Sequence, residues 1–346
     1  MNYYTTYQIS KSSIIQNIKN LKERLDKNTL ICAIVKANAY GHDLKTVCKI
    51  LKNRADFFGV ANINEAKTIR SFDKETKILI IGKTPKIYYD WCGKNNVSIS
   101  FLDFSDLPDK NPKTKLNFHL KIDSGLSRFG FNNKKDINSF LSLTKSFENL
   151  NLEGCFTHFA TKEKDIDFIL KQYSTFKKLT KTLPKNIIYH CSNSYASLNL
   201  PALKLNMVRV GFALYDSLKV ACKITSQIIN IKKIKKGETV GYDRTFKATK
   251  DTTIGVVPIG YADGLARNLS NNFHLYINGK FVKIVGNICM DICFVDITNV
   301  DVKLYDKIEI LGKHITLDDY AKKLNTSKYE IMLKFNHARM NIKTTK

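Results

Sequence analysis

Apolar residues in the first two thirds of the chain gather in short continuous runs. Because runs of this kind are buried on both faces, they predict the strands of a parallel sheet. We expect strands at residues 30–35, 57–60, 77–81, 97–102, 116–122, 152–158, 187–191 and 207–210. Segments with helical spacing alternate with these runs, at residues 10–27, 43–51, 63–72, 85–91, 136–147 and 165–179. The alternation favours a TIM-type (β/α)8 barrel over an open doubly wound sheet, since the glycine-rich first turn of that sheet is missing.

The pattern changes after about residue 218, where strand-like runs follow one another closely. These runs cover residues 224–234, 252–258, 274–277, 280–285, 293–297 and 307–311, with short helical segments at 317–324 and 329–335. Asn278 and Gly279 form a typical hairpin turn between two of the runs. We therefore predict an α/β protein with a barrel over residues 1–218 and a mostly-β C-terminal domain over residues 219–346. The first few residues can pack with the second domain.

The composition narrows the class of protein. The net charge of the 346 residues is +25, but the lysines are spread along the whole length. Nucleic-acid modules concentrate their charge on one face, so we expect no nucleic-acid partner. No apolar run is long enough to span a bilayer and the N-terminus lacks the form of a signal peptide, which predicts a cytoplasmic protein without membrane contact. The eight cysteines have no CxxC spacing, and we expect reduced thiols and no metal site.

Lys36 is the first residue with a chemical signature. An apolar strand runs directly into it, at the end of the strand where barrel enzymes place their active sites. A lysine in such dry surroundings has a lowered pKa, and its neutral amine can form a Schiff base. Tyr40, four residues later, can bond a phosphate. The common alternative is a surface lysine whose stem covers apolar neighbours.

The segment IVKANAYGH, residues 34–42, resembles the cofactor-lysine motif of the alanine racemases. The resemblance continues nearly from end to end. It includes KIDSGLSRFG at 121–130, GCFTHFAT at 154–161, HCSNS at 190–194, MVRVGFALY at 207–215, VGYDRTF at 240–246, GYADGLAR at 260–267 and GNICMD at 286–291. It implies a pyridoxal 5′-phosphate (PLP) enzyme with a barrel and a β domain.

The family roles, carried over motif by motif, are what this resemblance implies. Lys36 would hold PLP and act as the base on the D-face, while Tyr242 would be the base on the L-face. A relay from Tyr242 through His158 to Arg209, which contacts the pyridine nitrogen, would favour the phenolate. Arg128 would bond the PLP phenolic oxygen and the substrate carboxylate, with Lys121 a lysine often carbamylated in the family. The remaining cofactor and substrate residues would be Tyr40, Asn193, Ser194, Gly211 and Phe212 for PLP, and Met290, Tyr261 and Asp291 for the substrate.

The chain departs from the family pattern at several positions. Leu126 replaces a methionine, Asp216 a glycine, Asn287 an arginine and Ile292 a glutamine. The family also has a tyrosine near the C-terminus that supports the phosphate and the catalytic tyrosine. Here His337 is the candidate replacement.

The resemblance implies an alanine racemase that interconverts L- and D-alanine by two-base Cα proton transfer on a PLP aldimine and supplies D-alanine for peptidoglycan. It also implies a homodimer whose active sites use both chains. Alternatives are a racemase with broader substrates such as serine, a non-catalytic PLP-binding protein, which would resemble the barrel alone, and a PLP decarboxylase, which would lack the GYADG and CMD segments. A nucleic-acid binder has only the charge of +25 in its favour.

Overall fold

The computed structural model describes residues 4–161, 165–335 and 337–345, without the side chain of His337. The chain divides into two compact units. One, here called the barrel unit, comprises residues 15–39 and 44–218. The other, here called the β unit, comprises residues 1–14, 40–43 and 219–346.

The barrel unit is built on one sheet of parallel strands in the order β8-β7-β6-β5-β4-β3-β2-β9. The strands are β2 (Leu30–Ile34), β3 (Phe57–Val60), β4 (Lys77–Ile80), β5 (Val97–Phe101), β6 (Leu116–Lys121), β7 (Leu150–Phe156), β8 (Ile188–His190) and β9 (Met207–Val210). The two ends of the sheet meet, because the Asn206 amide donates to the Tyr189 carbonyl (3.1 Å) and the Arg209 amide to the Ser192 carbonyl (2.9 Å). The expected (β/α)8 barrel is confirmed.

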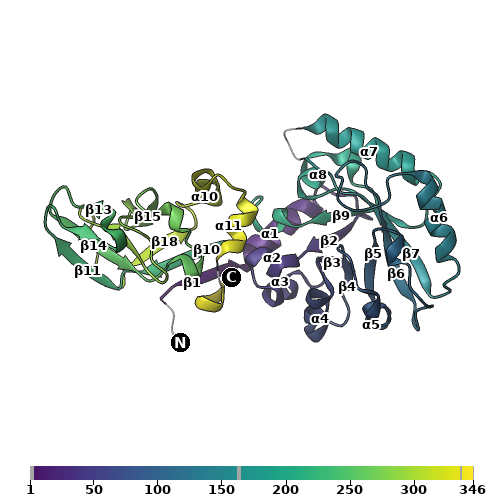
Figure 1. The fold of residues 1–346 in the computed structure, drawn as a ribbon, viewed down its shortest axis with the longest axis horizontal. Helices are drawn as coiled ribbons and strands as arrows, with labels where there is room; N and C mark the ends of the chain where they lie inside the picture. Colours follow the sequence, from purple (N-terminus) through teal and green to yellow (C-terminus); the bar gives the residue numbers. More distant parts are fainter. Residues whose placement is uncertain (1–3, 162–164, 336, 346) are drawn as a thin grey trace. The chain divides into compact units, whose positions relative to one another are not determined.

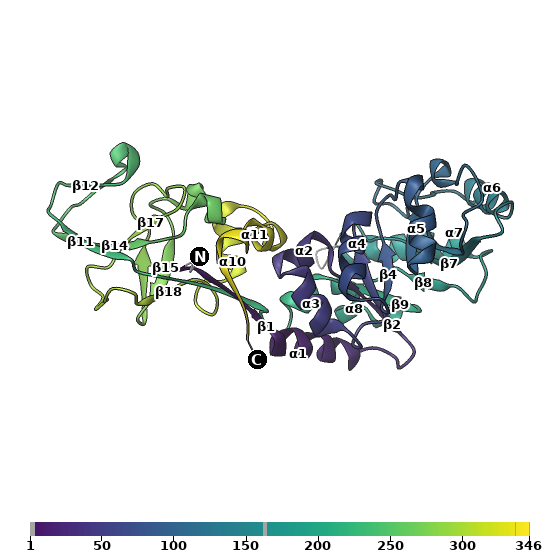
Figure 2. The ribbon, with the colours of Figure 1, turned by 90° about the horizontal axis from the view of Figure 1, so that it is seen from below.

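Helices follow the strands and cover the outside of the barrel (Figures 1 and 2). These are α1 (Lys11–Lys22), α3 (Leu44–Leu51), α4 (Ile63–Phe72), α5 (Tyr89–Lys94), α6 (Lys134–Thr144) and α7 (Ile166–Thr180). Three short helices come directly after strands, namely α2 (Lys36–Gly41), α8 (Ser194–Asn199) and α9 (Phe212–Tyr215). The strands of the barrel are buried over most of their length, as the continuous apolar runs predict.

The β unit contains a six-stranded sheet in the order β16-β15-β18-β10-β1-β19 and a three-stranded sheet in the order β11-β14-β17. The strands of the first are β1 (Thr6–Ser10), β10 (Cys222–Gln227), β15 (His274–Ile277), β16 (Lys280–Lys283), β18 (Lys307–Leu311) and β19 (Asn341–Thr345). Those of the second are β11 (Asn230–Ile234), β14 (Thr252–Val257) and β17 (Cys293–Asp296), and β12 (Thr239–Val240) pairs with β13 (Phe246–Lys247). Helices α10 (Leu317–Leu324) and α11 (Lys328–Lys334) complete the unit.

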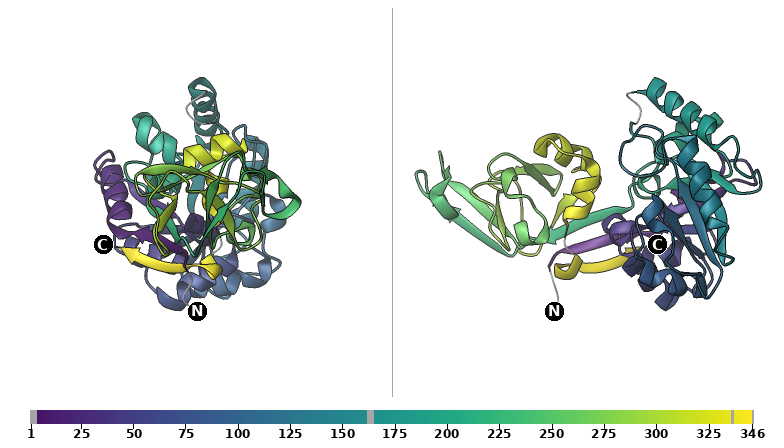
Figure 3. Two further views of the ribbon diagram at one scale, coloured as in Figure 1. Left: turned by 90° about the vertical axis from the view of Figure 1, so that its left-hand side faces the viewer. Right: turned by 45° about the vertical axis from the view of Figure 1, so that its right-hand side comes forward.

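The two ends of the chain meet in this unit. Strands β1 and β19 pair in parallel, with Thr6 opposite Asn341, and lie side by side in Figure 3. The pairing of β1 with β19 agrees with the expectation that the first few residues pack with the second domain. Across the described ranges, no helix is long and apolar enough to cross a membrane.

Several expected boundaries were wrong. The helix expected at 10–27 begins at Lys11 and ends at Lys22, because residues 6–10 form strand β1. The single strand expected at 224–234 is two strands in different sheets. The chain changes sheet at Ile228 and Ile229, whose amides donate to Asp306 and Val256, respectively. Because both residues are apolar, the sequence pattern hides this break.

Candidate active site

Lys36 follows the buried strand β2, at the carboxyl end of the barrel where the βα loops begin. Burial lowers the pKa of the Lys36 ammonium, and the positive charge of Arg128 lowers it further, with partial opposition from Glu65. A lysine with a lowered pKa supplies the neutral amine that Schiff-base formation needs. The surroundings of Lys36 thus agree with the expected cofactor lysine.

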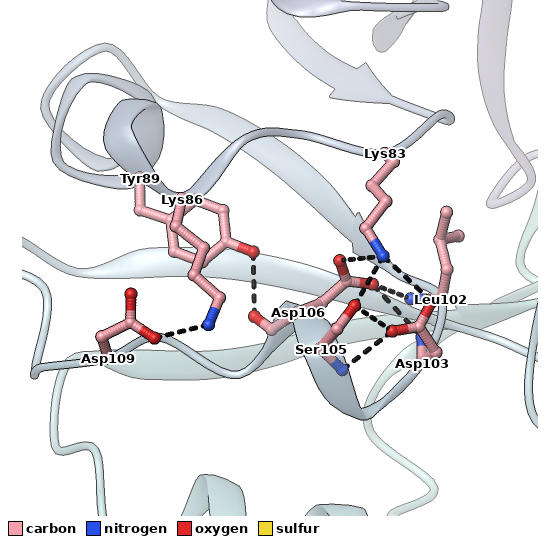
Figure 4. Close-up of polar contacts among 8 residues, drawn as sticks. All are labelled: Lys83, Lys86, Tyr89, Leu102, Asp103, Ser105, Asp106 and Asp109. Atoms are coloured by element: carbon pink, nitrogen blue, oxygen red, sulfur yellow. Dashed lines mark hydrogen bonds and ion pairs between the residues drawn. The ribbon is translucent and has the colours of Figure 1, made fainter.

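Lys83 follows β4, at the same edge of the barrel, and provides a direct contrast. Its ammonium bonds Asp103 (3.0 Å) and lies 3.3 Å from the buried carboxylate of Asp106 (Figure 4). Burial alone would lower the pKa of Lys83, but these carboxylates outweigh it and raise the pKa. Lys83 is therefore held as an ammonium that compensates a buried carboxylate, whereas Lys36 is not.

The turn after Lys36 has an unusual backbone. Residues 37–40 have φ between 52° and 55°, and Gly41 continues the turn at 76°. Left-handed backbone costs roughly 1–2 kcal/mol for each residue with a side chain, so neighbouring contacts must hold it. Glu65 supplies one of them, because its carboxylate accepts from the Ala37 and Ala61 amides, both at 2.7 Å. Glu65 was missed in the sequence, where an acidic residue in the first turn of a helix is too common to stand out.

Arg209 is buried at the end of β9 among neutral acceptors. Its guanidinium donates to the Thr157 carbonyl (2.7 Å), His190 Nδ1 (2.8 Å), His158 Nδ1 (3.3 Å) and the Cys191 carbonyl (3.3 Å). Burial lowers the pKa of Arg209 to about 10, which still leaves a cation at neutral pH. The site thus holds a fixed positive charge inside the barrel.

His158 is linked to this cation through one ring nitrogen. Because Arg209 has only donors, Nδ1 of His158 must accept, and the ring proton of the neutral imidazole lies on Nε2. Burial lowers the pKa of His158 well below its usual value, and the charges of Arg209, Lys121 and Arg128 lower it further. The structure therefore brings the expected residues of the barrel unit into one electrostatic neighbourhood, with His158 a neutral donor through Nε2.

The expected phosphate residues gather where β8 and β9 end. The Ser194 hydroxyl accepts from the amides of Gly211 (3.1 Å) and Ala213 (3.2 Å), at the start of the short helix α9. Asn193 caps α8 by accepting from the Ala196 amide (3.1 Å). Barrel enzymes commonly bind phosphate at the loops after the last two strands, beside the start of a short extra helix. Phe212 is the first residue of that helix.

Tyr40 belongs to the β unit together with residues 41–43. Its ring centre lies 6.1 Å from that of Tyr329. Burial raises the pKa of the Tyr40 hydroxyl, with a smaller contribution from Tyr329, so the phenol stays protonated and can donate a hydrogen bond.

Arg128 and Lys121 frame the loop after β6. Asp123 shapes this loop by accepting from four successive amides, those of residues 125–128. Arg128 is exposed, while Lys121 is 4% exposed and lies 4.8 Å from the centre of the Phe156 ring. Burial lowers the pKa of Lys121 well below its usual value, and the charges of Arg209 and Arg128 add to the effect. A buried neutral amine of this kind is the form that reacts in carbamylation.

Tyr242 lies in the β unit and is 72% exposed. It begins the 3-10 helix η4 (Tyr242–Arg244), in which Asp243 and Arg244 have positive φ. Asn287, one of the departures from the family pattern, donates to the Tyr242 carbonyl (3.2 Å) and to the Asp243 carboxylate (2.9 Å). Asn287 therefore supports the tyrosine loop through these two hydrogen bonds, in the place of an arginine.

The expected substrate residues of the β unit come from two segments that pack closely. Tyr261, in the 3-10 helix η5 (Tyr261–Asp263), and Met290 are exposed by 44% and 53%. The Tyr261 amide donates to the Cys289 carbonyl (3.1 Å), and a side chain at Gly260 would collide with the Met290 carbonyl at 2.2 Å. Exposed phenol, thioether and carboxylate groups thus come from two segments whose backbones lie against each other.

Arg339 joins these two segments to the C-terminal end of the chain. Its guanidinium pairs with Asp263 (2.7 Å) and with Asp291, so Asp291 has a cation as partner. The sequence reading assigned no role to Arg339, because a long-range ion pair leaves no local pattern. His337, the candidate replacement for the family tyrosine, has its side chain outside the described part of the structure.

No group of histidine, cysteine and carboxylate side chains suited to a metal ion occurs among the described residues.

Comparison with known proteins covers both units. Residues 9–218 match the family model "Alanine racemase, N-terminal domain", and residues 221–343 match "Alanine racemase, C-terminal domain". The chain is 35% identical to alanine racemase 2 of Caldanaerobacter subterraneus, over 94% of this chain and 91% of that protein. It is 34% identical to alanine racemase 1 of Bacillus subtilis, over 94% and 90% of the two chains.

Solved structures agree with the fold. An alanine racemase from E. faecalis superimposes with a TM-score of 0.94 at 32% identity, covering 99% of this chain and 98% of that one. An alanine racemase from Bartonella henselae with covalently bound pyridoxal phosphate superimposes with a TM-score of 0.88 at 26% identity, covering 99% of each chain.

Proposed function

The chain belongs to the alanine racemase family, and we propose that it interconverts L- and D-alanine with PLP as cofactor. The observation that carries the proposal is the presence, in one chain, of a lysine with a lowered pKa at the end of β2 and of an exposed tyrosine in the matched second unit. The first provides a cofactor amine, and the second a phenol available to a substrate.

The residues of the barrel unit fit PLP. Lys36 would hold its aldehyde carbon, and Ser194 with the amides of Gly211 and Phe212 would hold its phosphate, joined by the hydroxyl of Tyr40. Arg209 would face the pyridine nitrogen. Bound PLP supplies the electron sink that makes the alanine Cα proton removable near neutral pH. Because the guanidinium remains protonated, the facing ring nitrogen would stay largely unprotonated, which limits side reactions.

Each face of the substrate needs its own base. Lys36, free as an amine while alanine is bound, would accept and return the proton on the D-face. Tyr242 would do so on the L-face. His158 supports this assignment, because its Nε2 proton is available to a phenolate while Nδ1 is held by Arg209. Arg128 would bind the substrate carboxylate, with Tyr261, Met290 and Asp291 near the entrance of the site.

The exposure of Tyr242 supports a homodimer with shared sites. A base that is 72% exposed works among waters that compete for its hydrogen bonds. Burial against the barrel unit of a second chain would exclude that water. We therefore assign Lys36 of one protomer and Tyr242 of its partner to the same site.

Mixing two inactive variants tests both assignments. The variants Lys36→Ala and Tyr242→Ala are each expected to lack conversion of L-alanine to D-alanine. In an equal, randomly assorted mixture half of the dimers are mixed, and each of these has one intact site, so activity should return to about a quarter of wild type. Heterodimers that form without any recovered activity would contradict shared sites. A wild-type protein that binds PLP but leaves L-alanine unchanged would contradict the racemase itself.

A further inference from the structure

A line of polar side chains crosses the interior of the barrel unit, where aliphatic layers ordinarily pack. Arg209 Nη1 lies 2.8 Å from His190 Nδ1, and His190 Nε2 lies 2.8 Å from His119 Nδ1. His119 Nε2 then lies 3.1 Å from a carboxylate oxygen of Glu153. The line thus runs from β9 through β8 and β6 to β7, and both histidines are fully buried.

Only one protonation pattern satisfies every contact in this line. The guanidinium can only donate, so Nδ1 of His190 accepts and its proton lies on Nε2. That proton is donated to Nδ1 of His119, whose own proton therefore lies on Nε2 and is donated to Glu153. Burial lowers the pKa of both imidazoles. For His119 it outweighs the opposing effect of Glu153, and for His190 the charge of Arg209 lowers the pKa further, which agrees with two neutral rings.

The backbone is adapted to place Glu153 in this line. Along the pair of strands β6 and β7, Phe118 is opposite Leu152 but His119 is opposite Gly154, so Glu153 is an extra residue in β7. An irregularity of this kind redirects a side chain relative to the ordinary alternation. Gly154 leaves room for the imidazole, because a Cβ there would lie 2.4 Å from Nδ1 of His119.

Further contacts hold His190 and Glu153 in place. Phe156 stacks on the His190 ring, with centres 4.9 Å apart and planes 8° apart. Ser98 and Lys77 both donate to the Glu153 carboxylate, Lys77 at 3.0 Å. Burial would raise the pKa of Glu153. The hydrogen bonds from His119, Ser98 and Lys77, together with the attraction of a His119 ring that is charged at acidic pH, outweigh burial and lower the pKa to about 2.

We propose that Glu153 is a positioning residue for Arg209, acting through His119 and His190. By accepting the proton of His119, its carboxylate selects the tautomer of both histidines. His190 then presents an acceptor to Arg209, and the guanidinium is held in one orientation at the carboxyl end of β9. Only the last step, in which Arg209 faces the pyridine nitrogen, rests on the proposed function.

Nitrogen NMR on the holoenzyme with labelled histidines tests the direction of hydrogen-bond donation along the line. We expect His119 and His190 to be neutral at pH 7, each with the proton on Nε2 and with Nδ1 unprotonated. Assignment comes from the variants His119→Gln and His190→Gln, which each remove one set of signals. An imidazolium at either position, or a proton on Nδ1, would overturn the proposal.

Two variants separate orientation from simple stability. Glu153→Gln keeps an oxygen that accepts from His119, so both tautomers and the Kd for PLP should stay within about threefold of wild type. Glu153→Leu removes the acceptor, so the tautomers should become mixed and the Kd for PLP should rise about tenfold, by analogy with the loss of affinity when a metal-binding histidine loses the partner that orients it. The absorbance of bound PLP should shift in Glu153→Leu only.

Glu309→Gln is the matched control. Glu309 is a buried carboxylate beside a histidine, His314, but it lies in the β unit and bonds the amides of His314 and Ile315. This variant should lose stability while PLP affinity and the signals of His119 and His190 remain unchanged. Equal effects of Glu153→Leu and Glu309→Gln on PLP binding would overturn the proposal. Racemase activity plays no part in these measurements, so the proposed function can fail while the tautomers are as expected.

Discussion

The two units prepare their functional groups in different ways. In the barrel unit, the expected groups apart from the exposed Arg128 are buried or half-buried, and their charges act on one another: Arg209, Lys121 and Lys36 all lower the pKa of His158. In the β unit, Tyr242, Tyr261 and Met290 are exposed on the surface of their own chain. The comparison teaches that the barrel unit tunes its charged groups by burial within a single chain. In the proposed homodimer, the exposed groups of the β unit would gain a comparable environment from the barrel unit of a partner chain.

The largest expected effect separates two lysines of the barrel unit. Lys36→Arg keeps a positive charge but cannot form a Schiff base, so activity should fall by about 10⁴-fold or more. PLP should also wash out on gel filtration. Lys83→Arg should retain PLP and activity within a few-fold, because arginine can still pair with Asp103 and Asp106. Retention of covalently reducible PLP by Lys36→Arg would show that another lysine holds the cofactor.

The next largest effect is expected from loss of the Tyr242 phenol in the β unit, and it should differ between the L and D faces of the substrate. Tyr242→Phe removes the phenol but preserves the ring, and loss of one general base typically costs about 10²–10⁴-fold. The two enantiomers are equally stable, so overall kcat/KM must fall equally in both directions. The two faces separate only in exchange of the Cα hydrogen with deuterated water, where L-alanine should lose exchange far more than D-alanine. Equal loss of exchange from both enantiomers would contradict the assigned faces.

The barrel was predictable because its strands are buried on both faces and alternate with helices. The same reasoning placed Lys36 at the active end of β2. It failed where neighbours in space decide the structure: β1 and β19 are held by pairing between the two ends of the chain, and β19 is a polar segment that carries no strand pattern of its own.

The candidate site was predicted mainly from motifs. They name the residues proposed to touch the cofactor and substrate, because these share a segment with other recognisable residues. Glu153 and His119 were missed, since each looks like an isolated polar residue in an apolar strand. Only the irregular pairing of β6 and β7 reveals that they meet. Glu65 and Arg339 were hidden for the same reason, as their partners lie far along the chain.

The smallest expected effect compares one buried carboxylate in each unit through the pH dependence of stability. In Glu153→Gln the free energy of unfolding at neutral pH should fall by about 1–3 kcal/mol, because hydrogen bonds to the carboxylate favour its ionised form and the pKa of Glu153 is lowered from 4.5 to about 2 on folding. A carboxyl group whose pKa is lowered on folding stabilises the folded chain at pH values above its pKa in the unfolded chain. That contribution is lost as the pH falls from about 4.5 towards 2, where the protonated carboxyl resembles the amide.

Urea unfolding between pH 7 and pH 3 measures the difference in free energy of unfolding between wild type and Glu153→Gln. This difference should narrow steadily below about pH 4.5. Glu309→Gln should show the same sign, since burial of Glu309 is outweighed by hydrogen bonds from the amides of His314 and Ile315 and its pKa is lowered as well. The two variants should differ in which unit loses stability. Because Glu309 has no link to Arg209 in the described contacts, its replacement destabilises the β unit alone. A gap between wild type and Glu153→Gln that stays constant across this pH range would mean that the Glu153 carboxylate is not preferentially ionised in the folded barrel.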